Sequence, residues 1–146
     1  MTRENKELLL KDLCARLPYG VKVLDNSHKN YGVSKLINIG ADGSMLVDNE
    51  LNDIQYYPII NETKPYLRPM SSMTEEELFE VQDIIGKGVE ICNGFIDIVD
   101  SSIHRFTFLE LQAVFNWLLK NHFDFMDLIP KGLAIKVTEE NNPYEN

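Results

Sequence analysis

The pattern of hydrophobic and polar residues changes once along the chain, at residues 69–78. Before this point, short extended runs are separated by Gly, Asn and Asp, whereas from Thr74 onward apolar residues recur at the spacing of one helical face. Thr74 can cap such a helix, and Glu77 three residues later completes a capping box. We therefore expect one structural unit to end here and a second to begin with a helix over 75–85.

An opening helix is predicted over residues 4–17, ended by Pro18. Its apolar stripe is expected to consist of Leu10, Leu13, Cys14 and Leu17. The only other cysteine is Cys92, and two cysteines are too few for a disulfide framework. Both are expected to be small buried residues.

Five short strands are predicted to follow the opening helix. They are expected at 21–24, 33–39, 44–47, 54–60 and 66–68. The dipeptide Asp42-Gly43 between the second and third runs is a strong hairpin signal. Pro58 places the fourth strand at a sheet edge, because proline has no N–H to donate to a neighbouring strand. Five strands of this length can close a small barrel, so residues 18–70 are predicted to form an SH3-like β-barrel.

The second half of the chain predicts two helices separated by a hairpin. The first helix ends at Gly86, and the second begins after Thr107, which forms a capping box with Glu110. The hairpin is predicted from the dipeptide Asn93-Gly94. Strands are expected at 89–92, 95–99 and 103–106, a helical turn at 128–131 and an extended segment at 133–137.

Together these elements predict an α+β fold in three parts. Residues 1–72 are expected to form the opening helix and the small β-barrel. Residues 73–137 are expected to form an α+β unit (helix, short antiparallel strands, helix) packed on that barrel. The polar residues 138–146 are expected to be a frayed tail.

The net charge of −9 is distributed unevenly along the chain. Residues 1–36 hold seven Lys/Arg against four acids, whereas residues 37–146 hold seven against nineteen. Within the second part, residues 74–110 hold nine acids against two bases. A phosphate backbone is repelled by such a surface, so direct nucleic-acid binding is not expected. The charge favours solubility and leaves open a basic partner or mimicry of nucleic acid.

The sequence predicts a soluble, cytoplasmic protein with no membrane contact. No stretch approaches the roughly 18 consecutive apolar residues of a membrane span. The start of the chain carries charges of both signs and only three consecutive leucines, which is not the pattern of a signal peptide.

Residues capable of metal binding or catalysis are few. His104, His122 and Asp124 are candidate metal ligands, but the His-x-x-x-His spacing and any cysteine pair are missing. The acidic segment 48–53 does not fit a calcium loop, because Asp53 stands where that loop requires Gly. No recognisable nucleophile signature is present either. We therefore expect no catalytic residues, no metal and no cofactor.

Aromatic residues supply the candidate binding site. Four tyrosines fall in or beside the predicted barrel: Tyr31, Tyr56, Tyr57 and Tyr66. Small barrels often bind peptides through such residues in a groove, although core packing accounts for at least half of them. Adjacent residues of a strand face opposite sides, so at most one of Tyr56 and Tyr57 is expected to be buried.

Three stretches, in this order, resemble a known family. They are KELLLKDL (6–13) with LPYGV (17–21), KPYLRPMSSMT (64–74), and WLLKNHFDF (117–125) with KGLAI (131–135). They resemble a family of uncharacterised small proteins found in gut Bacteroides-type genomes and their phages or mobile elements. The resemblance implies a bacterial cytoplasmic protein of accessory type and implies no activity.

Three functional hypotheses follow from these observations. The first is a non-enzymatic accessory protein that binds a protein partner, because the surface is acidic, the aromatic residues suit a small barrel and no catalytic signature is present. The second is an acidic inhibitor or nucleic-acid mimic that acts on a DNA- or RNA-binding protein, motivated by residues 74–110. The third is a metal-dependent hydrolase built on His104, His122 and Asp124. The sequence does not predict the oligomeric state.

Overall fold

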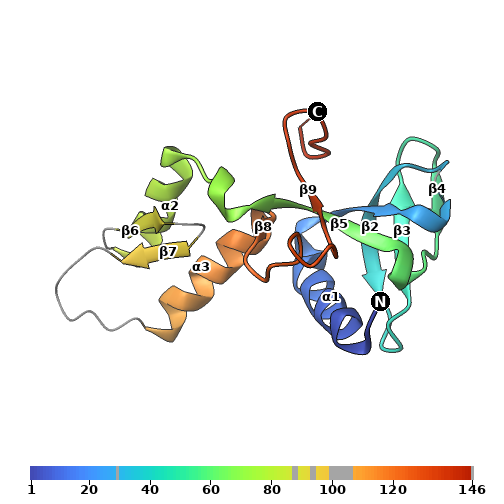
Figure 1. Cartoon of the computed structure of the whole chain (residues 1–146), viewed down its shortest axis with the longest axis horizontal. Helices are drawn as coiled ribbons and strands as arrows, with labels where there is room; N and C mark the ends of the chain where they lie inside the picture. Colours follow the sequence, from blue (N-terminus) through green and yellow to red (C-terminus); the bar gives the residue numbers. More distant parts are fainter. Residues whose placement is uncertain (29, 87–88, 93–94, 99–106, 146) are drawn as a thin grey trace. The chain divides into compact units, whose positions relative to one another are not determined.

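In the computed structural model the chain forms two compact units, and Figure 1 shows their elements coloured along the sequence. Unit 1 contains Met1–Leu67 and Met126–Asn146, and unit 2 contains Arg68–Phe125. Helices and a mixed sheet occur together, so the predicted α+β class is confirmed. The structure describes residues 1–28, 30–86, 89–92, 95–98 and 107–145, with the backbone alone for 89–92 and 95–98.

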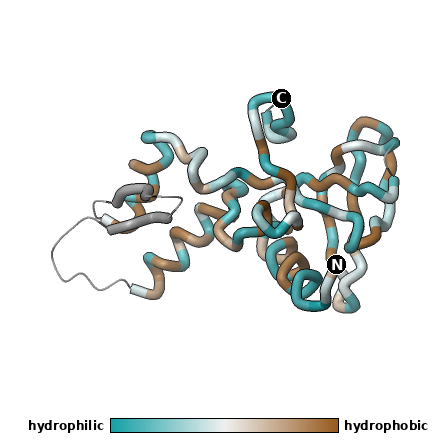
Figure 2. The backbone as a smooth tube through the Cα atoms, in the orientation of Figure 1, coloured by the Kyte–Doolittle hydropathy of each residue, from teal (hydrophilic) through white to brown (hydrophobic). Residues whose placement is uncertain are grey.

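Unit 1 consists of one long helix followed by short strands and turns. Its elements are α1 (Arg3–Arg16), η1 (Leu17–Tyr19), β1 (Lys22–Asp25), η2 (Asn26–His28), β2 (Val33–Ile39), β3 (Met45–Asn49), β4 (Ile54–Tyr56), η3 (Ile60–Glu62), β5 (Thr63–Pro69) and β9 (Ile135–Lys136). The last two residues of β5 belong to unit 2. Figure 2 shows hydrophobic and hydrophilic stretches following one another along α1 and these strands.

The sheet of unit 1 is antiparallel over its first five strands, in the order β4-β3-β2-β1-β5, and β9 pairs with β5 in parallel. The predicted hairpin between β2 and β3 is confirmed. In its register Leu36 lies opposite Val47, and both side chains are buried. A bulge follows, between Leu36 and Asn38. The alternation of side chains along each strand thus places one face of the sheet in the core.

The SH3-like barrel is not confirmed, because the sheet is not closed. The strand order begins at β4. On the side away from β1, β5 pairs with β9 and, through Arg68 and Pro69, with β8 (Phe123–Asp124). Closing a barrel would require β4 to pair with a second neighbour. Instead β4 ends at Tyr56, two residues before Pro58, which confirms the prediction that this strand lies at an edge.

The buried face of α1 differs from the predicted stripe. Leu9, Leu13, Asp12 and Arg16 are buried, whereas Cys14 is exposed, so the prediction of a buried Cys14 is wrong. The guanidinium of Arg16 donates to both carboxylate oxygens of Asp12, at 2.7 and 3.0 Å, and neither side chain is exposed to solvent. A pair of opposite charges can lie on the buried face of a helix, and a prediction that uses only the apolar residues does not include such a pair.

The core of unit 1 draws on both ends of the chain. Residues of α1 and of the sheet share one hydrophobic cluster with Leu128, Leu133 and Ala134, which follow unit 2 in sequence. The segment 126–137 was expected in the second unit, but it lies in unit 1. Its apolar side chains complete a core that the first 67 residues leave open, and β9 extends the sheet beside β5.

The segment expected to be a frayed tail is attached to unit 1. Asn141 bonds back to Thr138 and Lys136 through its side chain. The hydroxyl of Tyr144 accepts from the Lys22 N–H (3.2 Å) and donates to the Tyr66 carbonyl (2.8 Å). Burial raises the pKa of Tyr144 well above its ordinary value, so the hydroxyl stays protonated.

This contact closes a gap between two strands. Val23 of β1 lies opposite Pro65 of β5, so Lys22 and Tyr66 occupy the next position of the same ladder. There the Tyr144 hydroxyl bridges the two strands in place of a direct hydrogen bond. The hydroxyl therefore gives the Lys22 N–H an acceptor and the Tyr66 carbonyl a donor, which the two strands do not provide to each other at this position.

Unit 2 contains two helices, a separate hairpin and the short strand β8. Its elements are η4 (Met70–Ser72), α2 (Glu75–Ile85), β6 (Val89–Cys92), β7 (Phe95–Ile98), α3 (Phe108–Lys120) and β8. Both predicted capping boxes are confirmed, at the N-termini of α2 and α3. The predicted antiparallel pairing of β6 with β7 is also confirmed, whereas the predicted strand at 103–106 lies outside the described residues.

The core of unit 2 lies where α2 meets α3. Val81 and Ile85 of α2 are buried and pack with four partly buried residues: Met73, Leu78, Val114 and Trp117. Arg68 makes a bidentate ion pair with Glu77 at the start of α2, at 2.5 and 2.8 Å. The same guanidinium lies 4.3 Å from the ring centre of Phe123. Arg68 therefore links α2 to β8 within this unit.

Candidate functional site

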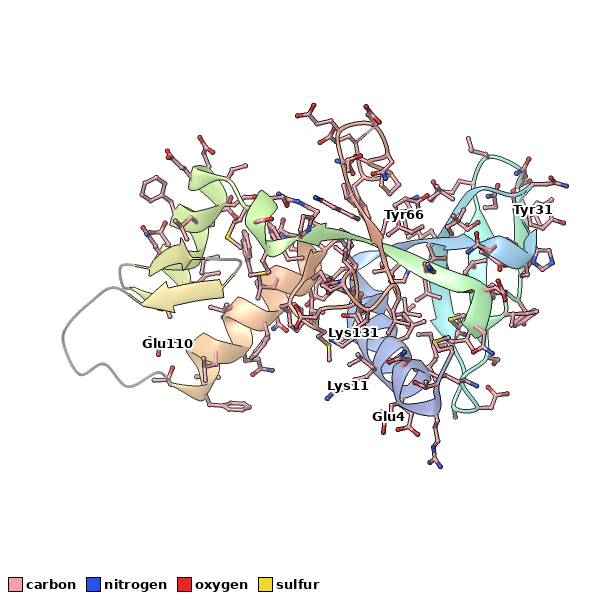
Figure 3. The ribbon with its side chains drawn as sticks, viewed as in Figure 1. Glu4, Lys11, Tyr31, Tyr66, Glu110 and Lys131 are labelled. Atoms are coloured by element: carbon pink, nitrogen blue, oxygen red, sulfur yellow. The ribbon has the colours of Figure 1, made fainter. Side chains whose placement is uncertain are left out.

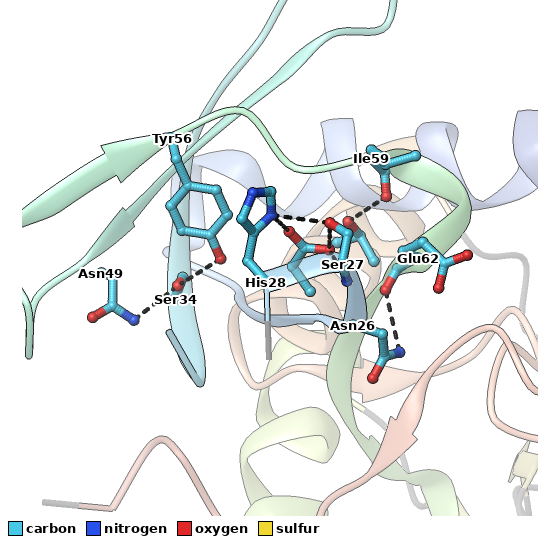
Figure 4. Close-up of polar contacts among 10 residues, drawn as sticks. Asn26, Ser27, His28, Ser34, Asn49, Tyr56, Ile59 and Glu62 are labelled. Atoms are coloured by element: carbon cyan, nitrogen blue, oxygen red, sulfur yellow. Dashed lines mark hydrogen bonds and ion pairs between the residues drawn. The ribbon is translucent and has the colours of Figure 1, made fainter. Parts of the chain in front are cut away.

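A buried carboxylate shapes the loop between β1 and β2. Asp25, at the end of β1, has no exposed side-chain surface. Its oxygens accept from the Ser27 N–H (2.9 Å), the Ser27 hydroxyl (2.5 Å) and Nδ1 of His28 (2.7 Å). Figure 4 labels Ser27 and His28 and marks polar contacts around them with dashed lines. The contact with the Ser27 N–H is an Asx turn, in which an Asp side chain bonds to the backbone two residues ahead. Asp25 thereby fixes the orientation of the His28 ring.

Three aromatic rings gather around His28. Its ring stacks on Tyr31 at 5.4 Å with an interplanar angle of 4°, and it meets Tyr56 at 5.0 Å. Tyr31 and Tyr56 are 4.9 Å apart. A surface hollow of about 460 Å³ adjoins these rings, lined by Asn26, Ser27, His28, Asn30 and Tyr31. We call His28, Tyr31 and Tyr56 the aromatic cluster.

Hydrogen bonds hold the two tyrosines of the aromatic cluster in place. The Tyr56 hydroxyl lies 3.3 Å from the hydroxyl of Ser34, and burial raises the pKa of Tyr56, so it stays protonated. Asn49, fully buried at the end of β3, bonds through its side-chain nitrogen to Ser34 and to the backbone carbonyls of Tyr31 and Val33. Asn49 is therefore a positioning residue for the segment that carries Tyr31.

The arrangement of Ser27, His28 and Asp25 does not activate a nucleophile. In a Ser-His-Asp triad the serine and the aspartate contact opposite nitrogens of the imidazole. Here both contact Nδ1, since the Ser27 oxygen is 3.0 Å from it, and the Ser27 hydroxyl also contacts Asp25. The geometry suits a fixed binding surface, with Nε2 of His28 left to contact a ligand.

Exposed apolar side chains continue from this site along the sheet edge. One of them lies in the three-residue strand β4, and the other three flank it in sequence. Their exposed fractions are 88% for Leu51, 36% for Ile54, 70% for Tyr57 and 55% for Ile59. We call these four residues the edge surface. Single exposed apolar residues are common on proteins, but several along one sheet edge indicate a contact surface.

The structure separates the four predicted tyrosines. Tyr31 and Tyr56 belong to the aromatic cluster, and Tyr57 belongs to the edge surface. The expected opposite orientation of Tyr56 and Tyr57 is confirmed, because Tyr56 packs against the core. Tyr66 is buried on β5 and, as Figure 3 shows, lies apart from Tyr31.

Sequence reasoning missed three residues of this site: Asp25, His28 and Asn49. The spacing of Asp25 and Ser27 was an available signal, because Asp-x-Ser favours an Asx turn. Nothing in the sequence pattern reveals the bonds of Asn49, since its partners in the segment 31–34 are brought close only by the pairing of β2 with β3.

The predicted metal ligands do not assemble in the part of the chain that the structure describes. His122 and Asp124 are nearly buried on either side of Phe123, and His104 lies outside the described residues. Among the residues described, no group of three His, Cys, Asp or Glu side chains could hold a metal ion. This includes the acidic segment 48–53.

The acids of residues 74–110 are partly engaged in structural contacts. Glu77 binds Arg68, Glu110 closes a capping box, and Glu80 accepts from the Trp117 indole N–H at 2.8 Å. Glu76, Glu80 and Asp83 share one face of α2 by their spacing. The side chains of Glu90, Asp97 and Asp100 lie outside the described residues.

The chain matches no protein-family model, no curated protein and no solved structure. The resemblance to a bacterial accessory family therefore stays a prediction. In the described part of the chain, no helix has both the length and the apolar composition needed to cross a membrane.

Proposed function

We propose that this chain is a non-enzymatic interaction protein that binds an extended segment of a partner protein along the edge of its sheet. The observation that carries the proposal is the position of β4. It is a terminal strand of the sheet, flanked by the edge surface and adjoining the aromatic cluster through Tyr56. A terminal strand presents backbone groups to a further strand, and the side chains beside it select the occupant.

The aromatic cluster gives this edge a rigid platform. His28 is fixed by a buried carboxylate, and Tyr31 by the bonds that Asn49 makes to its segment. Aromatic rings held in one position contribute contact area with little loss of conformational entropy on binding. The neighbouring hollow offers room for one side chain of the bound segment.

An acidic inhibitor of a nucleic-acid-binding protein is the second candidate. The alignment of Glu76, Glu80 and Asp83 on one face of α2 favours it. It is weakened by Glu77, Glu80 and Glu110, whose carboxylates already have partners inside unit 2. A protein that mimics a phosphate backbone needs its charges free to meet the partner's cations.

Selection from a displayed library tests the main proposal. Random peptides of about ten residues, the upper length of an ordinary strand, are selected on the purified full chain. They are then measured against the double variant Tyr57→Ser/Ile59→Ser. Selected peptides should lose about tenfold or more in affinity, which is about 1.4 kcal/mol. Both replaced side chains are exposed, so the variant should keep its fold and circular dichroism spectrum.

Phe79→Ser is the matched control, because Phe79 is 62% exposed but belongs to α2 in unit 2. Binding to this variant should equal binding to the unchanged chain. If the selected peptides bind the Tyr57/Ile59 variant as tightly as the unchanged chain, the proposed site is wrong.

A further inference from the structure

We infer that the segment bound at the edge surface is basic, with Lys or Arg alternating with apolar residues. This inference rests on the proposed function and specifies its partner. It follows from the charges that surround the edge surface, from the shortness of β4 and from the two-residue period of an extended chain.

The chain around the edge surface is acidic without interruption. Residues 36–63 contain five acids and no Lys or Arg. Asp48, Glu50 and Asp53 lie at or near the turn between β3 and β4, and Glu62 ends η3. The four apolar residues of the edge surface therefore stand among carboxylates.

Among the described residues, Glu50 is the only one of these five acids that has an ion pair. Lys22 lies 3.3 Å from Glu50, and Lys35 stands opposite Asp48 in the pairing of β2 with β3. Among the described residues, no cation lies within ion-pair distance of Asp53 or Glu62. Asp53 directly precedes β4 and Glu62 ends η3, so these two carboxylates are placed to attract the cations of a partner bound at this edge.

The same charges disfavour two other occupants. A second copy of this chain would bring two acidic edges together, and like charges facing each other across an interface repel. A nucleic acid would bring phosphates against the same carboxylates. A basic protein segment carries the opposite charge to the carboxylates, so neither of these repulsions arises with it.

The shortness of β4 makes side-chain contacts decisive. Its three residues can form few backbone hydrogen bonds with an added strand, and Pro58 offers no donor beyond them. Affinity must therefore come from apolar contacts with Tyr57 and Ile59 and from ionic contacts with Asp53 and Glu62. An added strand points alternate residues to opposite sides, so one side can be apolar and the other basic.

A set of three synthetic peptides tests this chemistry. All have about eight residues and the same Val and Ile at alternate positions, and the remaining positions are all Lys, all Gln or all Glu. Their affinities for the full chain are measured by isothermal titration calorimetry at about 0.1 M and about 0.5 M salt. The Lys peptide should bind at least tenfold more tightly than the Gln peptide, and high salt should remove most of that difference.

Two charge variants distinguish the effect of Asp53 and Glu62 on peptide affinity from the effect of the chain's overall negative charge. Asp53→Asn/Glu62→Gln should reduce the advantage of the Lys peptide to a few fold. Asn tolerates the left-handed backbone of Asp53, whose φ is 51°. Glu139→Gln/Glu140→Gln removes the same number of charges from exposed positions of the segment 138–145, and it should leave the advantage unchanged.

The outcomes distinguish the two proposals. Equal binding of the Lys and Gln peptides, with both weakened by Tyr57→Ser/Ile59→Ser, would overturn the basic-partner inference and leave the binding edge in place. If neither these peptides nor any from the library depends on Tyr57 and Ile59, the proposed function fails and the inference fails with it.

Discussion

Two buried polar residues of unit 1, Asp25 and Asn49, hold the His28 ring and the segment that carries Tyr31. Each is fully buried and makes at least three hydrogen bonds, so its desolvation is offset inside the fold. Both lie at the ends of strands, where the chain turns. The aromatic cluster is thus held by polar contacts rather than by apolar packing alone.

Tyr144 gives a prediction at this scale. Replacing it with Phe keeps the ring but removes the hydroxyl that joins Lys22 N–H to the Tyr66 carbonyl. The loss should reduce the free energy of unfolding by about 1–3 kcal/mol, because both backbone groups lose a partner. Urea unfolding followed by circular dichroism measures it. The control is Glu145→Gln at the exposed neighbouring residue, and equal stability of the two variants would show that the bridge contributes nothing.

The burial of single residues was only partly predictable from the sequence. The alternation rule correctly separated Tyr56 from Tyr57, because it depends only on strand geometry. Burial of Asp12, Asp25 and Asn49 was not predictable, since polar residues are usually exposed and their partners come together only in the fold.

Helix ends were the most predictable elements of this chain. The two capping boxes are local, so Thr74 with Glu77 and Thr107 with Glu110 identify the helix starts without reference to the rest of the fold. The strand β8 was not predicted, and β9 was predicted only as part of an extended segment at 133–137. Each has two residues, and each exists only because β5 offers an edge to pair with.

The start of α2 yields a prediction about pH. Burial raises the pKa of Glu77, but hydrogen bonds from Arg68 and from the Thr74 N–H outweigh it, so the pKa lies below the ordinary 4.5. The folded state therefore binds this proton more weakly than the unfolded state does. Its contribution to stability is complete above about pH 4.5 and is lost as the pH falls through the lower folded value.

Glu77→Gln should remove this pH dependence, because Gln is neutral throughout yet still suits the capping box. Between pH 5 and pH 3, the unchanged chain should lose on the order of 1 kcal/mol more stability than the variant. Fluorescence of Trp117, the only tryptophan, reports the unfolding of unit 2. Glu75→Gln, at an exposed first-turn position, should keep the original slope. Equal slopes for Glu77→Gln and the unchanged chain would contradict the assignment.

At the scale of the whole molecule, unit 2 interrupts unit 1 in the sequence. The chain leaves unit 1 within β5 and returns at Met126 to supply Leu128, Leu133 and Ala134 to the first core. Sequence patterns placed the boundary near residue 72, where helical periodicity begins. They gave no sign that the chain returns, because a core shared by distant segments leaves no local signature. The strands beyond β5 were missed for the same reason, since β8 and β9 pair with a strand far back along the chain.

The open edge at β4 is the central element of the functional account. It is terminal in the sheet, short, surrounded by exposed apolar residues and set in an acidic stretch. Amide hydrogen exchange, measured with and without the tightest peptide from the selection, tests it most directly. A strand added to β4 should slow exchange at the β4 amides that point away from β3 and at Tyr31 in the aromatic cluster, while exchange in α2 stays unchanged. Unchanged exchange across 54–57, or slowing confined to α2 and α3, would contradict the assignment of this edge as the binding site.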